Sequence, residues 1–285
     1  GYDVVIVDNL SNSREDALDG IEKITGIRPT FEKVDLRDFD ATESVFKKYP
    51  KISGIIHFAA SKAVGESVQK PLLYYHNNIV SLINLLQLMP KYDVKGIIFS
   101  SSCTVYGQPD VLPATEETPI KKAESPYGNT KQINEEIIAD TIKSGSPIKA
   151  ILLRYFNPIG AHPTAFIGEM PNGVPQNLIP YLTQTAMGIR KELSVFGDDY
   201  DTPDGSCIRD YIYVVDLAKA HVCAMTRIME DQTTEPVEVY NIGTGTGTSV
   251  LELINAFEKA TGVKLNYKIV GRRAGDIEKV WGNVE

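Results

Sequence analysis

The sequence predicts an α/β fold, with a doubly wound parallel sheet followed by a smaller C-terminal lobe. Short apolar runs of strand length alternate with segments of helical periodicity through the first half of the chain, which is typical of a parallel sheet covered by helices. Polar residues follow the ends of these runs, where such sheets bind ligands. After Asn157 the chain becomes rich in Pro and Gly, which indicates loops and short helices outside the main sheet.

Each predicted strand is a short apolar run that ends at polar residues or at a turn. In chain order the strands are Asp3–Val7, Thr30–Asp35, Gly54–Ala60, Gly96–Ser101 and Ala150–Tyr155, with a later short strand at Glu238–Ile242. Helical spacing appears at Val80, Ile83, Leu86 and Leu88, and again at Ile133, Ile137, Ile138 and Ile142. We expect residues 1–157 with about 206–230 to form the main domain, and about 158–205 with 231–285 to form the lobe.

Composition and charge exclude several classes of protein. The chain has 285 residues, 42% of them hydrophobic, so it can bury a large core. Its apolar runs are too short for a transmembrane span, and a net charge of −8 argues against nucleic acid as the main partner. The cysteines, Cys103, Cys207 and Cys223, match neither a disulfide framework nor a zinc site, which favours a reducing, cytoplasmic location. The histidines lack metal-ligand spacing, so no metal is assigned.

The most informative motif combines a serine at a strand end with a tyrosine and a lysine on a later helix. Ser102 follows the run Gly96–Ser101, and Tyr127 and Lys131 lie four residues apart, one turn apart on the same face of a helix. A nearby ammonium favours the phenolate, so Tyr127 can act as a base well below its ordinary pKa of about 10. The trio therefore predicts oxidation of an alcohol by a nicotinamide cofactor. A YxxxK spacing also occurs on ordinary solvated helices. The upstream Ser102, and Ser125-Pro126 as the predicted start of the helix, favour the catalytic interpretation.

Asp8 follows the first predicted strand, where a carboxylate can accept hydrogen bonds from the adenosine ribose of a dinucleotide. Asp8 could instead be a turn or cap residue. The next residues, Asn9 to Ser13, lack the arginine that NADP would favour, so the pattern indicates NAD, although Arg14 lies close.

A dinucleotide-binding fold should begin with a strand and a glycine-rich phosphate turn before the strand that ends near Asp8. The chain starts at Gly1-Tyr2, at the entry to that second strand, so we expect the first strand and the glycine loop to be missing from it. The later segment Gly243–Gly247 (GTGTG) lies far beyond Asp8, so we interpret it as a backbone turn.

Two arginine motifs, Arg209-Asp210-Tyr211 and Arg272-Arg273-Ala274-Gly275-Asp276, suit a diphosphate, although each could be a surface ion pair. With their neighbours, these motifs resemble the UDP-glucose 4-epimerases of the extended short-chain dehydrogenase/reductase superfamily, and fungal members most. The matching stretches are Asp8–Ser13, Ile56–Ser67, Phe99–Gly107, Pro126–Lys131, Leu153–His162, Val195–Asp201, Arg209–Ile212 and Gly271–Asp276. The resemblance covers essentially the whole chain. It implies a Rossmann-type sheet, tightly bound NAD, and interconversion of UDP-galactose and UDP-glucose by transient oxidation at C4′.

The resemblance also implies a role for each matching residue. Tyr127 is the acid and base, Lys131 binds the nicotinamide ribose and lowers the pKa of Tyr127, and Ser102 bridges Tyr127 and the sugar hydroxyl. Besides Tyr127 and Lys131, the NAD-contacting positions are Asp8, Asn9, Leu10, Ser11, Asn12, Ser13, Asp35, Leu36, Phe58, Ala59, Ala60, Lys62, Asn77 (or its neighbour Asn78), Tyr155 and Phe156. The substrate-binding positions are Ser102, Cys103, Thr104, Tyr127, Asn157, Asn177, Leu178, Ser194, Val195, Phe196, Arg209, Arg273 and Asp276.

Other functions stay open on the sequence. A nucleotide-sugar 4,6-dehydratase would need an acidic pair after the catalytic hydroxyl, where this chain has Cys103 and Thr104. A simple dehydrogenase would release its reduced cofactor, and a catalytically silent NAD-binding regulatory module should have lost part of the trio. The resemblance further implies a homodimer formed by helices beside the catalytic one. The resemblance also implies that the residue at Val280 helps to decide whether N-acetylated sugars fit, and its small side chain predicts some activity on UDP-N-acetylhexosamines.

Overall fold

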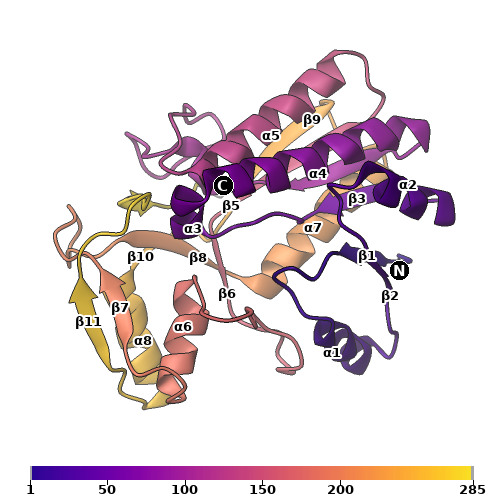
Figure 1. The fold of residues 1–285 in the computed structure, drawn as a ribbon. Helices are drawn as coiled ribbons and strands as arrows, with labels where there is room; N and C mark the ends of the chain where they lie inside the picture. The colour runs from indigo at the N-terminus through magenta and orange to yellow at the C-terminus, as the bar shows by residue number, and fades with distance from the viewer. Residues whose placement is uncertain (1, 284–285) are drawn as a thin grey trace.

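The predicted apolar runs form the main sheet in a computed structural model, which describes residues 2–283. Four strands pair in parallel in the order β3-β4-β5-β9 (Figure 1). Their bounds are β3 Gly54–His57, β4 Gly96–Ser100, β5 Lys149–Tyr155 and β9 Val237–Ile242. The parallel pairing confirms the predicted fold class, and the strand ends lie within three residues of the predicted ones.

Helices cover both faces of this sheet because its central strands are apolar on both sides. Ile97 and Leu152 pack in a core with α4 Pro71–Lys91 and α5 Pro126–Lys143. Their neighbours Ile98 and Ile151 face the other way, onto α7 Val214–Met229. None of the helices between residues 2 and 283 is both long and apolar enough to cross a membrane.

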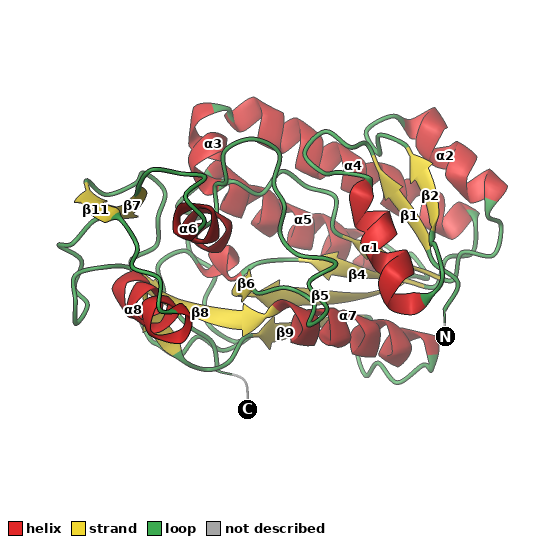
Figure 2. Cartoon of the chain, turned by 90° about the horizontal axis from the view of Figure 1, so that it is seen from below, coloured by secondary structure: helices red, strands yellow, loops and turns green. Residues whose placement is uncertain are grey.

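A separate two-stranded parallel sheet precedes the main one in the chain. It consists of β1 Val5–Asp8 and β2 Thr30–Lys33, and it is flanked by α1 Asp16–Thr25 and α2 Phe39–Lys48 (Figure 2). The Asp38 side chain caps α2 by accepting a hydrogen bond from the amide of Ala41 at 3.0 Å. As a result, the residues that follow β1 and β2 lie together at the carboxyl ends of two neighbouring strands.

The helix that carries the tyrosine and lysine begins where the sequence predicts. Ser125 accepts a hydrogen bond from the amide of Gly128, and Pro126 occupies the first turn of α5. α5 packs against α4, where Asn78 donates to the hydroxyl of Thr130 at 3.0 Å. The short helices α3 Val64–Gln69 and η1 Cys103–Tyr106 complete this side of the molecule.

The smaller lobe contains two further sheets. In one, β8 Ile208–Tyr213 pairs with β6 Asn157–Ile159, β10 Gly247–Ser249 and β12 Lys279–Val280. The other pairs β7 Leu193–Phe196 with β11 Tyr267–Val270. The helices α6 Leu178–Ala186 and α8 Val250–Thr261 share an apolar core with β7 (Figure 1).

The strand pairing divides the chain differently from the predicted boundaries. β9 pairs with β5 in the main sheet, whereas the sequence placed residues 231–285 in the lobe. Conversely, β8 pairs with the lobe strands, whereas the sequence placed about 206–230 in the main domain. Both differences have one cause: the partner of a strand is chosen by contacts between distant segments, which local periodicity does not contain.

The segment Gly243–Gly247 surrounds a buried carboxylate. Asp210 accepts hydrogen bonds from the amides of Thr244 and Gly245, at 2.8 and 3.0 Å, and from the Thr244 hydroxyl at 2.6 Å. A Cβ on Gly243 would lie 2.5 Å from Asp210 Oδ2. This geometry agrees with the interpretation as a backbone turn and explains its glycine, because the turn binds an anion that belongs to the chain itself.

Candidate active site

A cavity of about 730 Å³ opens at the carboxyl ends of β4 and β5 and extends between the main sheet and the lobe. Most of the residues predicted to bind substrate or the nicotinamide end of a dinucleotide line it. They are Phe58, Ala60, Lys62, Ser102, Cys103, Thr104, Tyr127, Lys131, Tyr155, Phe156, Asn157, Asn177, Leu178, Ser194, Val195, Phe196, Arg209, Arg273 and Asp276. Residues up to 222 positions apart in the chain (58 to 280) thus surround one space.

A second, smaller cavity of about 50 Å³ adjoins the first, and Ala60 lines both. The predicted residues that line it are Asp8, Asn9, Ser11, Asn12, Asp35, Leu36, Ala59, Ala60 and Asn77. Leu10 and Ser13 line neither cavity, and both instead bind the Asp8 carboxylate, through the Leu10 amide at 2.6 Å and the Ser13 hydroxyl at 2.7 Å. They therefore orient Asp8 rather than border the space itself.

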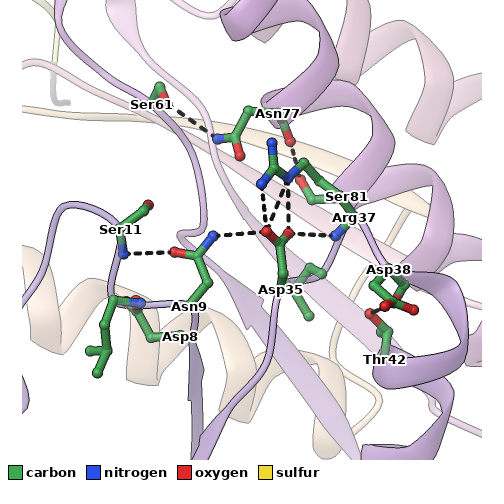
Figure 3. Close-up of polar contacts among 12 residues, drawn as sticks. Asp8, Asn9, Ser11, Asp35, Arg37, Asp38, Thr42, Ser61, Asn77 and Ser81 are labelled. Atoms are coloured by element: carbon green, nitrogen blue, oxygen red, sulfur yellow. Dashed lines mark hydrogen bonds and ion pairs between the residues drawn. The ribbon is translucent and has the colours of Figure 1, made fainter.

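Polar contacts fix the shape of this smaller cavity (Figure 3). Asn9 and Arg37 converge on the Asp35 carboxylate, with Arg37 Nη2 at 2.5 Å from Asp35 Oδ2. Hydrogen bonds from Arg37 hold the pKa of Asp35 well below its usual range. On the opposite wall, Asn77 donates to the Ser61 hydroxyl at 3.3 Å, while the buried Asn78 side chain accepts from the Ser61 amide and donates to the Ser61 carbonyl. Asn77, rather than Asn78, is thus the residue that borders the cavity.

The tyrosine, lysine and serine of the motif meet at the closed end of the large cavity. Lys131 Nζ donates to the carbonyl of Ser100 at 2.6 Å and lies 5.8 Å from the centre of the Tyr127 ring. Ser102 caps η1 by accepting a hydrogen bond from the amide of Thr104 at 3.3 Å, which leaves its own proton available. The Ser100 hydroxyl is hydrogen-bonded to Tyr155.

Burial controls the ionisation of this pair. Removal from water raises the pKa of Tyr127 far above its ordinary value, and Tyr155 adds to the shift, while Ser102 opposes it. Burial also lowers the pKa of Lys131 to about 8, against the attraction of Glu135. The sequence predicted that Lys131 would lower the pKa of Tyr127. Burial has the larger effect and raises this pKa, so the separate contribution of the Lys131 ammonium stays a prediction.

Two guanidinium groups that line the same cavity face one carboxylate. Arg273 binds Asp276 through two nitrogens, at 2.7 and 3.1 Å, and Arg209 Nη2 lies 4.0 Å from the same carboxylate. Arg273 also lies 5.3 Å from the centre of the Phe196 ring. Arginines that keep free donors beside an aromatic face suit a diphosphate joined to a planar base.

The chemistry of these groups fits a dinucleotide bound along the two cavities. Asp8 is positioned for ribose hydroxyls, the exposed ammonium of Lys62 for a phosphate, and Tyr127 and Lys131 for the second ribose. Of the residues from 2 to 283, no group of three or more His, Cys, Asp or Glu side chains is placed to hold a metal ion.

Comparison with known proteins decides the family. A family model described as the NAD dependent epimerase/dehydratase family matches residues 1–243 of the chain.

The chain belongs to the NAD dependent epimerase/dehydratase family.

Within this family, the chain is 52% identical over 288 residues to UDP-glucose 4-epimerase 2 of Arabidopsis thaliana, covering 100% of this chain and 81% of the plant protein. It is 51% identical over 287 residues to UDP-glucose 4-epimerase uge1 of Schizosaccharomyces pombe, covering 99% and 80%. The plant and yeast identities are nearly equal, so they do not single out fungal members.

A solved family structure agrees with the fold. The crystal structure of UDP-glucose 4-epimerase from Bifidobacterium longum, in complex with NAD⁺ and UDP, superimposes with a TM-score of 0.96 at 50% identity. The superposition covers 100% of this chain and 83% of the bacterial one.

Sequence reasoning missed two residues of this epimerase/dehydratase site. Ser100 supplies the carbonyl that orients Lys131, and the serine run Ser100–Ser102 before η1 was the available signal. Glu169 lines the cavity and joins its two sides, binding Lys62 Nζ at 3.1 Å and Asn177 Nδ2 at 2.6 Å. Glu169 lies in an irregular Pro/Gly-rich loop, where no periodicity could have indicated its direction.

Proposed function

We propose that this chain catalyses the reversible interconversion of UDP-galactose and UDP-glucose, with NAD as a bound cofactor. The observation that carries the proposal is a single cavity that is lined both by Ser102, Tyr127 and Lys131 and by Arg209 and Arg273. The relatives that match nearly the whole chain are UDP-glucose 4-epimerases, which supports the same conclusion.

Tyr127 exchanges the proton of the sugar hydroxyl at C4′. Tyr127 and Ser102 both line the cavity, and the hydrogen bond of Ser102 to the phenol lowers the pKa of Tyr127 against the effect of burial. Lys131, fixed on the Ser100 carbonyl, holds a positive charge beside the phenol and faces the space for the cofactor ribose. When bound, NAD supplies the reversible hydride acceptor for C4′. Inversion then requires that Tyr127 return its proton after the sugar has presented its other face.

The site must bind the nucleotide more tightly than the hexose. Arg209 and Arg273 can form charge-assisted hydrogen bonds to the diphosphate, and Phe196 offers a ring face to the uracil. The hexose must turn between the two half-reactions, so binding energy at the nucleotide retains the substrate while the sugar stays mobile.

The structure disfavours dehydration as an alternative reaction. A 4,6-dehydratase needs an acid and a base directly after the catalytic hydroxyl. Cys103 occupies the first of these positions, and burial raises the pKa of its thiol to about 12. Thr104, at the second, carries a hydroxyl that does not exchange protons near neutral pH. Neither side chain can supply the required proton transfer.

The test is an assay of the purified protein with UDP-galactose and no added NAD. We expect UDP-glucose to form without net release of reduced cofactor. Tyr127→Phe should lower kcat by ~10²–10⁴-fold, as loss of a general acid and base does. Formation of a 6-deoxy-4-keto sugar, release of NADH in proportion to turnover, or near-normal turnover of Tyr127→Phe would each contradict the proposal.

We further propose that the protein is a homodimer, formed through α3 and α4 beside the catalytic helix. Leu72, Leu73 and Val68 support this, because all three are apolar and exposed, and Leu72 is 81% exposed. Light scattering after size exclusion should give a dimer for the parent and a monomer for Leu72→Glu. A monomeric parent would reject the proposal.

We also propose that UDP-N-acetylhexosamines are accepted and that the protein acts in the cytoplasm. The small side chain of Val280 lines the cavity, which leaves room for an acetamide group, and the three cysteines are unpaired. Val280→Tyr should abolish turnover of UDP-N-acetylgalactosamine and spare UDP-galactose. If the parent does not turn over the acetylated sugar, the proposed substrate range is wrong. If cell fractionation recovers the protein in an oxidising compartment, the proposed cytoplasmic location is wrong.

A further inference from the structure

The segment Ser100–Ser102 at the end of β4 is bound by one face of α5 through residues spaced four apart. Tyr127, Lys131 and Glu135 occupy three successive turns of that face. Lys131 donates to the Ser100 carbonyl at 2.6 Å, and the Ser101 hydroxyl donates to Glu135. The next serine lies beside Tyr127 and favours its ionised form. The strand end and the helix are therefore held in register at three consecutive residues.

Glu135 has a second partner from the neighbouring strand. Arg154 on β5 binds the carboxylate with two nitrogens, Nε at 3.0 Å and Nη2 at 2.6 Å, and each side chain is only 7% exposed. Arg154 Nη1 also donates to the Tyr106 hydroxyl at 3.2 Å, and this hydroxyl donates to the side chain of Asn241 on β9 at 2.7 Å. This network has no predicted role in binding substrate or cofactor, and neither Glu135 nor Arg154 lines the cavity.

We propose that Glu135 is a positioning residue that keeps Lys131 protonated and directed at the Ser100 carbonyl, and so sets the geometry and charge beside Tyr127. The inference rests on the proposed function. It assigns the reaction a carboxylate that touches neither substrate nor cofactor and acts through Lys131 and Ser101.

The charges around the pair support this assignment. The titratable groups that face Tyr127 and Lys131 from other elements are His57 on β3, Tyr74 on α4, Cys103 on η1 and Tyr155 on β5. Burial holds each of them in its neutral form at neutral pH, lowering the pKa of His57 to about 3 and raising those of the tyrosines and the thiol. Glu135, one turn from Lys131, provides the negative charge that opposes the cost of burying that ammonium. Arg154 lies behind the carboxylate and binds it through two nitrogens.

Removal of the Glu135 charge should lower the pKa of Lys131. Loss of a carboxylate one turn away, together with the Arg154 cation left behind it, disfavours the ammonium. Because burial has already lowered the pKa of Lys131 to about 8, a further fall in this pKa would leave the lysine largely neutral at physiological pH. The lysine would then lose both its charge beside Tyr127 and its firm bond to the Ser100 carbonyl.

The test is carbon-13 NMR of labelled lysine side chains in the cofactor-loaded protein, with the Lys131 signal assigned by its loss in Lys131→Met. In Glu135→Gln we expect the titration midpoint of Lys131 to fall by about one pH unit or more. We also expect kcat for UDP-galactose to fall ~10-fold or more with KM within ~3-fold, because the substrate contacts are intact. The matched control is Glu136→Gln, an exposed carboxylate on the next position of the same helix, which should behave as the parent in both measurements.

If Glu135→Gln does not fold, Ser101→Ala tests the proposal instead. This variant removes the hydrogen bond from Ser101 to Glu135 and leaves the Glu135–Arg154 ion pair intact. We expect a several-fold loss of kcat with KM unchanged. The proposal is overturned if folded Glu135→Gln keeps the parental Lys131 midpoint, or if kcat is unaffected in Ser101→Ala. A parent that does not interconvert the two sugars would refute the proposed function, while the lysine titration would still decide the role of Glu135.

Discussion

Lys131 combines a chemical role with a cost to folding. Its side chain is 3% exposed, and the described hydrogen bond of its ammonium goes to one carbonyl, that of Ser100. Glu135, whose charge favours the ammonium, is shared with Arg154. An ammonium held in this way is less stable than one in water, which is the usual condition of a group tuned for proton chemistry.

The burial of Lys131 makes its contribution to stability depend on pH. Its pKa of about 8 in the folded protein lies below the ordinary 10.5, so the folded state releases the proton more easily than the unfolded state. The cost of the buried charge is fully present below about pH 8 and disappears as pH rises toward 10.5. Lys131→Met lacks this cost. At pH 7, Lys131→Met should therefore have a higher free energy of unfolding than the parent. This difference should shrink by about 3 kcal/mol between pH 7 and pH 10.5.

Urea denaturation of both proteins from pH 7 to pH 10 measures this gain. The matched control is Lys143→Met, which removes an exposed lysine from the last turn of the same helix. A gain for Lys131→Met that stays constant with pH would show that the buried ammonium carries no such cost.

At the scale of elements, the turn Gly243–Gly247 connects three segments around one carboxylate. Asp210 belongs to β8, the turn follows β9, and the amide of Gly282 approaches the same carboxylate at 3.4 Å. β8 also carries Arg209, so the turn helps to fix a residue proposed to bind the diphosphate. The glycines make this possible, because their backbone can approach the carboxylate closely.

Gly243→Ala should disrupt this junction. The new Cβ would lie 2.5 Å from Asp210 Oδ2 and 2.9 Å from the Phe156 ring, so either the carboxylate or the ring must move. We expect a loss of ~1–3 kcal/mol in the free energy of unfolding, as for other overpacked sites. Gly271→Ala is the matched control, because no atom lies within 4 Å of its Cβ position, and it should change little. Equal stability of the two variants by urea denaturation would contradict the assignment.

At the scale of the whole molecule, the cavity is a junction between the main sheet and the lobe. Tyr127 and Lys131 come from α5 on the main sheet, while Phe196 and Arg209 come from lobe strands. A ligand that binds both walls therefore stabilises the arrangement of the two parts, by an amount that mass action sets.

UDP should stabilise the parent by ~2.7 kcal/mol at a concentration 100 times its Kd. Arg273→Met should weaken UDP binding by ~10-fold or more, because it removes charge-assisted hydrogen bonds to the diphosphate. Arg272→Met is the matched control, since Arg272 binds Asp199 at 2.7 Å and does not line the cavity. Calorimetric titration with UDP would contradict this assignment if the two variants lost affinity equally.

Much of the fold and of the candidate site could be predicted from the sequence. Strand-length apolar runs and helical spacing are local properties, so they located the main strands, α5 with its Ser125 cap, and the parallel architecture. Ser102, Tyr127 and Lys131 could be selected because the chemistry of a residue type and a spacing of one helical turn both belong to the chain itself. The same holds for the arginines, whose affinity for diphosphate does not depend on the fold.

The tertiary structure alone decided which distant segments meet and how deeply each group is buried. It placed β9 in the main sheet and β8 in the lobe, and it brought Glu135 and Arg154 together beneath the catalytic face of α5. It also buried the Tyr127 phenol, which raises its pKa. The physical reason is the same in each case: strand partners, desolvation and the field of neighbouring charges depend on atoms that are close in space and far apart in sequence.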